Sequence, residues 1–217
     1  MMNLPDPFTL VVVLLLVGLV PFAVVMMTAF VKVVVVLFLL RNALGLQQTP
    51  PNLLLYGIAV VFTAFVLAPV FYEIADILGS QDVSIETAAG WKDAAARAAV
   101  PVKGFLTRFA EPEETTFFIQ ATEQLWPPEM QAEADEQDIL ILVPAFVVSE
   151  LTRAFEIGFL IYLPFIAIDL VVSNVLLALG MMMVSPMMIS LPIKLLLFVS
   201  LDGWSKLMHG LVLTYSG

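Results

Sequence analysis

Two long stretches without a charged side chain constrain the fold of this chain more than any other feature. Residues 7–31 contain no Asp, Glu, Lys or Arg, and neither do residues 170–193. A helix rises about 1.5 Å per residue, so residues 7–31 are long enough to cross the roughly 30 Å hydrocarbon core of a bilayer. With 61% apolar and 13% charged residues, the composition is that of a membrane protein, because soluble domains are less apolar. We therefore predict an all-α protein.

Turn signals divide the first half of the chain into two apolar helices. The first ends near Arg41, after an interruption at Lys32. Gly45 and the pair Pro50-Pro51 break the charge-free run that follows. This pattern predicts a turn at residues 42–52 and a second helix at about 53–72. With two apolar stretches in the second half, the chain is expected to form about four long, kinked helical segments arranged as two hairpins.

The second half is less regular, because five charges lie in or beside apolar helix: Glu150, Arg153, Glu156, Asp169 and Lys194. A charge near the bilayer centre costs about 2.5–3.5 kcal/mol even on insertion scales. Lys32, Arg41 and Lys194 fit positions at the membrane surface, but Asp169 lies between two apolar runs and does not. Helices of this kind pack against protein more readily than against lipid, which favours an obligate oligomer.

The acidic residues are concentrated between the two apolar halves. Residues 73–138 carry 14 acidic and 4 basic side chains, which accounts for the net charge of −10. The chain thus divides into an apolar hairpin (1–72), an acidic insert of short helices (73–138) and a second apolar hairpin (139–217). An acidic surface argues against nucleic-acid binding. Lys32 and Arg41 both lie near the first turn, so the positive-inside rule places that turn in the cytoplasm and the insert, with both termini, outside.

Little in the sequence points to catalysis. Cysteine is absent and His209 is the single histidine, which leaves no multi-histidine or thiolate metal site. The motifs H-E-x-x-H, G-x-S-x-G, G-x-x-x-x-G-K-[ST] and G-x-G-x-x-G do not occur. We expect no cofactor, no metal and no enzymatic activity.

Two motifs are not explained by a simple bundle of membrane helices. One is the turn, which is dense in amides and prolines: Arg41, Asn42, Gln47, Gln48, Pro50, Pro51 and Asn52. The other is the triplet Met181, Met182 and Met183, between Gly180 and Pro186. Gly180 and Pro186 weaken a helix and favour a bend or loop. The methionines either pack in a core or form an adaptable apolar surface, since an unbranched thioether has several rotamers.

At both motifs the chain resembles the SctR/FliP export-gate family. The resemblance covers roughly residues 8–72 and 139–210, and is weak in the insert. It continues in the second half at Pro144-Ala145-Phe146, Ser149-Glu150-Leu151, Ile157-Gly158-Phe159, Pro164-Phe165, Ile168-Asp169-Leu170, Gly180 to Val184, Leu191-Pro192, Lys194 and Asp202-Gly203-Trp204. The amino-acid sequence of residues 149–169 is more similar to the injectisome branch of the family than to the flagellar branch.

The resemblance implies a pore subunit of a bacterial type III secretion export apparatus in the inner membrane. In that family several copies form a helical assembly with SctS/FliQ-type and SctT/FliR-type subunits and with a larger export-gate protein. The cargo is unfolded secreted protein, and lipid surrounds the assembly. The resemblance also implies that the triplet Met181–Met183 is a gasket at the channel constriction. Of the two possibilities given above, this agrees with an adaptable apolar surface.

Two other functions remain open at the level of sequence. A small-solute or ion transporter would use a membrane-buried carboxylate, either Asp169 or Glu150. An intramembrane enzyme is disfavoured by the missing nucleophile and histidine motifs. Separately, an unpaired charge in a low-dielectric assembly is costly. We therefore expect Glu150 and Lys194 to pair between subunits, with Arg153 and Glu156 as competing partners.

Overall fold

The computed structural model describes residues 14, 18–19, 21–80, 88–132 and 134–216. These residues are helical or lie in turns and loops, and none of them forms a strand, which confirms the all-α prediction. The helices are α2 (Phe30–Ala43), α3 (Asn52–Gly79), α4 (Ala88–Phe109), α5 (Pro112–Leu125), α6 (Pro128–Gln131), α7 (Ile139–Ala178), α8 (Pro186–Ser200) and α9 (Gly203–Leu213).

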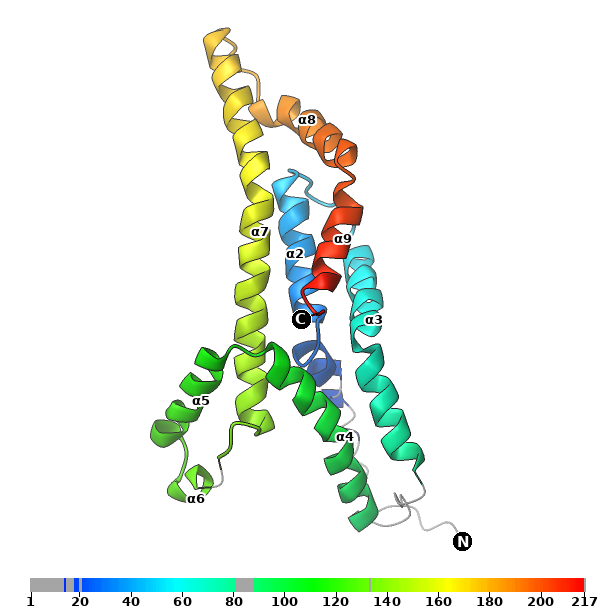
Figure 1. Ribbon diagram of the computed structural model, residues 1–217. Coiled ribbons are helices and arrows are strands. Elements are labelled where there is room, and N and C mark those ends of the chain that lie inside the picture. Colours follow the sequence, from blue (N-terminus) through cyan, green and yellow to red (C-terminus); the bar gives the residue numbers. More distant parts are fainter. Residues whose placement is uncertain (1–13, 15–17, 20, 81–87, 133, 217) are drawn as a thin grey trace.

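The long helix α7 forms the spine of the molecule (Figure 1). α2 lies alongside it, and α3 lies on the other side of α2. α4 and α5 pack on the lower part of α7, whereas α8 crosses above the end of α2 and continues into α9 (Figure 1). The acidic helices and the turn between α2 and α3 therefore lie at opposite ends of α2 and α3.

Three clusters of buried apolar side chains follow one another along α7. Phe146 belongs to the lowest cluster, with residues of α4. Ala154 belongs to the middle cluster, with residues of α2, α3 and α9. Phe165 belongs to the upper cluster, with the end of α2 and with α8. Gly158 lets α2 approach closely, because a Cβ atom there would lie 2.2 Å from Cδ1 of Leu39.

Part of the first predicted segment, residues 7–31, lies outside the described residues. Within the described part, residues 21–26 are helical, residues 27–29 form a turn, and α2 begins at Phe30. The N–H of Phe30 donates to Oγ1 of Thr28 at 3.3 Å. This hydrogen bond satisfies one of the backbone N–H groups that have no partner within the helix at the start of α2. The helix break thus precedes Lys32 instead of falling at it, and Lys32 lies inside α2.

The predicted turn between the first two helices is confirmed. α2 ends at Ala43 and α3 begins at Asn52. Gly45 adopts a φ of +78°, a conformation that favours glycine. α3 is longer than predicted: it passes Pro69 and continues to Gly79. The acidic residues of its last turns do not end the helix, because their side chains can be solvated.

α7 is the first of the two long segments expected in the second half, and α8 with α9 follows as the second. α7 runs without interruption for 40 residues, through Pro144 and Pro164 and past every charge between Glu150 and Asp169. Its start at Ile139 coincides with the predicted end of the insert, and Asp138 caps it by accepting from the N–H of Leu140. The charged residues did not end this helix, because Glu150 and Arg153, which point towards the rest of the protein, form ion pairs with residues outside α7.

Of the four expected segments, the first is only partly described, and the others can be compared with the helices of the structure. Among the described residues, α3 and α7 are each long and apolar enough to cross a membrane. α8 and α9 together would make a third span, although they are bent by 62° at Asp202. The acidic region contains the short helices predicted for it, α4 to α6, and α4 extends beyond the alanine-rich stretch through Pro101.

Candidate functional site

An ion pair shut off from solvent lies between α2 and α7. Lys32 and Glu150 are both 0% exposed, and Nζ of Lys32 lies 3.1 Å from Oε1 of Glu150. Either charge alone would be strongly unfavourable in an apolar interior. The expectation that Lys32 lies at the membrane surface is therefore wrong: its side chain points into the core, where a carboxylate from another helix compensates it.

The C-terminal segment completes this pair. The hydroxyl of Tyr215 donates to Oε2 of Glu150, and Nζ of Lys32 lies 3.6 Å from the centre of the Tyr215 ring, a cation–π arrangement. Burial, and then the charge of Glu150, raise the pKa of the Tyr215 hydroxyl above its usual value. The hydroxyl therefore stays protonated and remains a hydrogen-bond donor.

Arg153 extends the pair to the corner between α4 and α5. Its Nη1 lies 3.5 Å from Oε1 of Glu150 and donates to the carbonyl oxygen of Phe109 at 2.8 Å. Its Nη2 binds the carboxylate of Glu111, whose backbone N–H donates to Oγ of Ser149 at 2.8 Å. We call Lys32, Glu150, Arg153, Glu111 and Tyr215 the central ion cluster. It joins α2, α7, the acidic insert and the C-terminal segment.

A second ion pair lies near the other end of α7. Nζ of Lys194, from α8, lies 2.6 Å from Oδ2 of Asp169 on α7. The same ammonium donates to the carbonyl oxygen of Ala43 at 3.1 Å, one of the groups left without a partner at the end of α2. Lys194 is 5% exposed, so the expectation that it lies at the membrane surface is also wrong.

These contacts bear on the pairing expected for Glu150 and Lys194. Within one chain, Glu150 pairs with Lys32, and Lys194 pairs with Asp169. Arg153, expected as a competitor, does contact Glu150. A contact between subunits is not tested by a single chain and stays a prediction, but the buried charges that motivated it are already compensated. Both carboxylates considered for a transporter are held by lysines, and no contact favours that alternative.

Arg41 organises the turn between α2 and α3. Its Nη1 donates to Oδ1 of Asn52 at 2.6 Å and to the carbonyl oxygen of Pro50 at 3.3 Å, and its guanidinium lies over the ring of Phe38. Arg41, at the end of α2, thus holds the far end of the turn, at the start of α3, by hydrogen bonds. The remaining motif residues are exposed: Asn42, Gln47, Gln48 and Pro51.

The methionine triplet lies in the loop between α7 and α8, at the far end of the molecule (Figure 1). Gly180 has a φ of +73° and reverses the chain there, while Pro186 occupies the first turn of α8. The predicted break in the helix is confirmed. Met182 and Met183 are 82% and 100% exposed, so the triplet is not a packed core of this chain.

Two helices carry large apolar faces that the chain itself does not cover. On α3 the exposed residues include Leu53, Leu54, Tyr56, Val60, Val61, Phe65, Phe71 and Tyr72. On α7 they include Phe155, Phe159, Leu160, Leu163, Ile166, Leu170, Val171 and Val175. Contiguous apolar surface of this kind marks contact with lipid or with other proteins.

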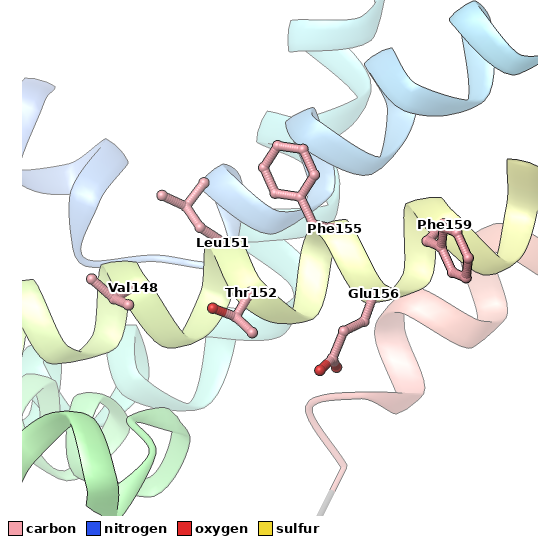
Figure 2. Close-up of a pocket in the computed structure, with 6 residues that line it drawn as sticks. All are labelled: Val148, Leu151, Thr152, Phe155, Glu156 and Phe159. Atoms are coloured by element: carbon pink, nitrogen blue, oxygen red, sulfur yellow. The ribbon is translucent and has the colours of Figure 1, made fainter.

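An open groove follows the exposed face of α7. It is lined by Val148, Leu151, Thr152, Phe155, Glu156 and Phe159, all from this one helix (Figure 2). Glu156 projects from the helix beside Phe159 (Figure 2), and it has no ion pair with any described residue. The same residues thus present a charge within an apolar surface.

No cluster of three His, Cys, Asp or Glu side chains suited to a metal ion occurs among the described residues. The groups that sequence reasoning missed are Lys32 and Tyr215 of the central ion cluster. A signal for Lys32 existed, since a lysine inside an otherwise apolar run needs a compensating charge. Tyr215 gave none, because its contact with Glu150 depends on how α9 folds back along α7.

These features define an all-helical protein of the membrane type, held together by buried ion pairs and with apolar faces left uncovered. Residues 13–211 match the FliP family. The chain therefore belongs to the FliP family, as the resemblance of its motifs predicted.

Several relatives are similar over nearly their whole length. The Yop proteins translocation protein R of Yersinia pestis is 52% identical over 217 residues, which is 100% of both chains. The harpin secretion protein HrcR of Erwinia amylovora is 43% identical over 210 residues, 97% of each chain. The virulence protein YscR of Salmonella typhimurium is 44% identical over 217 residues, covering 99% of this chain and 100% of that one.

Proposed function

We propose that this chain is a structural, pore-forming subunit of a type III secretion export apparatus of the injectisome branch. It conducts unfolded proteins across the bacterial inner membrane and catalyses no reaction. Membership of the FliP family supports this function. So do the names of its relatives, which describe translocation of Yop proteins, secretion of harpin and virulence.

The exposed methionine loop is the observation that carries the pore assignment. Methionines 181 to 183 extend beyond the helices at the end of α7, with their thioethers uncovered. If several copies stand side by side, their loops meet and form a deformable apolar ring. Such a ring can admit any side chain of an unfolded protein and can still close against ions, because unbranched thioethers repack readily.

The uncovered faces of α3 and α7 supply the contacts of the assembly. We assign them to further copies of this chain, to SctS/FliQ-type and SctT/FliR-type subunits and to the larger export-gate protein, with lipid on the outermost surface. The regions 1–72 and 139–217 form the two apolar units. Residues 73–138 form the acidic unit, which we place in the periplasm, with the turn at 42–52 facing the cytoplasm.

Secretion by living cells tests the function as a whole. Deleting the gene should abolish export of the type III substrates into the medium, and the chain supplied from a plasmid should restore it. Purified in mild detergent with its neighbouring gene products, the chain should run as a complex of several copies in native mass spectrometry. Normal secretion by the deletion strain would disprove the proposed function.

Replacing Met181, Met182 and Met183 with alanine tests the pore assignment. The complex should keep its composition, but its ion conductance in a planar bilayer should rise about tenfold or more, because alanine leaves the constriction unfilled. Met130→Ala, at an exposed methionine of α6 in the acidic region, is the matched control and should leave conductance unchanged. Equal conductance of the triple variant and the parent would show that the triplet does not line the pore.

A further inference from the structure

Glu156 is a charge on an apolar surface, and no described residue forms an ion pair with it. It lies 17 residues into α7, a candidate membrane span, and is flanked along the exposed face by Phe155 and Phe159. A carboxylate directed at lipid from such a position is costly. Its neighbour Arg153 cannot serve it, because that guanidinium is held by Glu111 and Glu150. A cation from outside this chain is therefore needed.

The cations of the two apolar regions can be compared one by one. Lys32 and Lys194 are buried in ion pairs, Arg153 belongs to the central ion cluster, and Arg41 is bound to Asn52. Lys206 of α9 is different, because it is exposed and has no ion pair with any described residue. Asp202, four residues earlier, does not contact its ammonium.

Lys206 lies in an apolar groove of its own. The groove runs between α7 and α9 and is lined by Ile157, Leu160, Ile161, Leu207, Gly210 and Leu211, together with Lys206 and Thr214. α9 runs from the upper cluster, where Leu207 packs, down to Tyr215 at Glu150, so Lys206 lies near Ile161, further along α7 than Glu156. Ile157 and Ile161 follow Phe155 and Phe159 by two residues, or about 200° around the helix, so the two grooves lie on different sides of α7.

Two different surfaces of opposite charge, displaced from each other along α7, suit repeated lateral packing in which each copy is shifted along the axis of the assembly. We propose that the Phe155–Phe159 face of α7 in one copy packs into the α7–α9 groove of the next copy, with Glu156 opposite Lys206. Phe155 and Phe159, 58% and 62% exposed, would fill the apolar groove, and each buried charge would gain its counterpart. Because the two surfaces differ, the contact is heterologous and adds copies in sequence around an axis. This inference rests on the self-assembly proposed above.

Cysteine cross-linking tests the contact directly, because the chain has no cysteine of its own. Two differently tagged copies, one Glu156→Cys and one Lys206→Cys, are expressed together with the partner subunits and oxidised in membranes. A disulfide-linked dimer carrying both tags is expected. Ser205→Cys in place of Lys206→Cys is the control, since Ser205 is exposed but about 100° around α9, and its dimer yield should be several-fold lower.

Charge reversal gives a second measurement. Glu156→Lys and Lys206→Glu should each lower the yield of the assembled complex about tenfold, because like charges then face each other. The double reversal in one chain should restore most of that yield. Equal yields from all three variants would overturn the proposal, as would a cross-link to a polypeptide other than the second tagged copy.

The failures of the two proposals are distinguishable. If the cross-link is missing from a complex that still holds several copies and still secretes, this contact is wrong and the proposed function stands. If the chain runs as a monomer and its deletion leaves secretion intact, both are wrong.

Discussion

Glu150 illustrates how much one buried side chain can determine. Its carboxylate receives Lys32, Arg153 and the Tyr215 hydroxyl, from three different segments of the chain. Burying several charges is favourable only when every one is compensated, so the cluster tolerates the loss of no single member. It also specifies one register of α2 against α7, since a shift by one residue would separate the charges.

Removing the charge of Lys32 should be more harmful than removing both charges of the pair. Lys32→Met leaves Glu150 buried without its main counter-ion and should lower the free energy of unfolding by about 3–5 kcal/mol. Adding Glu150→Gln keeps an acceptor for Tyr215 but removes the charge, and should recover much of the loss. Thermal unfolding of the purified protein in detergent, followed by circular dichroism, measures both.

The matched control for this pair is Arg97→Met. Arg97 and Asp93 form an exposed ion pair along α4, with side chains 47% and 50% exposed. Its loss should cost less than about 1 kcal/mol, because solvent screens the interaction. A Lys32→Met variant as stable as Arg97→Met would contradict the role assigned to the buried pair.

The charges themselves were visible in the sequence, but their partners were not. Glu150 and Lys194 were correctly expected to need counter-charges. That Asp169 avoids lipid stays a prediction, because its side chain is 45% exposed in the single chain. Choosing between Lys32 and Lys194 for Glu150 required knowing which helices pack together at which height, and that depends on long-range contacts. The same limit explains why Lys32 and Lys194 were placed at the membrane surface.

α7 and α2 share the most extensive contact between helices of the described structure. Gly158 of α7 has Leu39 of α2 against it, with Cβ and Cγ of Leu39 both 3.2 Å from the position of an added Cβ. Gly158→Ala should lower the free energy of unfolding by about 1–3 kcal/mol through overpacking, despite the better helix propensity of alanine.

Two further variants separate the cost of overpacking at residue 158 from the gain in helix propensity when glycine is replaced by alanine. Gly57→Ala in α3, where nothing lies within 4 Å of the added Cβ, should be neutral or stabilising by up to about 1 kcal/mol. Leu39→Ala should relieve part of the cost of Gly158→Ala when the two are combined. A Gly158→Ala protein that unfolds at the same temperature as Gly57→Ala would refute the close approach.

Breaker residues made some element boundaries predictable. Gly45 and Pro50-Pro51 fixed the turn before α3, and Gly180 with Pro186 fixed the loop after α7. The continuity of α7 was not predictable in the same way. Its charges made that stretch look irregular, but ion pairs with α2 and α8 and a hydrogen bond from the C-terminal segment compensate them, and the helix continues past them. At about 1.5 Å per residue it is roughly 60 Å long, twice the thickness of a hydrocarbon core.

The whole molecule is polarised between its two ends. The acidic helices α4 to α6 lie at one end, and the α2–α3 turn and the methionine loop lie towards the other (Figure 1). Composition and charge were sufficient to predict this division, because 14 of the acidic residues fall between positions 73 and 138. The packing of the acidic region onto α7, through Glu111 and Arg153, was not predicted.

Labelling of single cysteines tests the orientation in the membrane. Gln120→Cys in α5 should react with an impermeant thiol reagent in intact spheroplasts, because we place that region in the periplasm. Gln48→Cys, exposed in the turn, should react only after the membrane is opened. The parent chain, which has no cysteine, is the control for background. Labelling of Gln48→Cys but not of Gln120→Cys would mean that the orientation is reversed.

The place of Tyr215 in the central ion cluster has a consequence for biosynthesis. Lys32 and Glu150 leave the ribosome well before Tyr215, which is 65 residues beyond Glu150. At about 5–20 residues per second, translation needs several seconds to cover that distance. During this interval the nascent chain holds a cluster without its tyrosine, and a chain interrupted before Tyr215 never completes it. A chain that lacks Tyr215 therefore has one hydrogen-bond donor fewer at the buried carboxylate of Glu150 and leaves Lys32 without its aromatic ring.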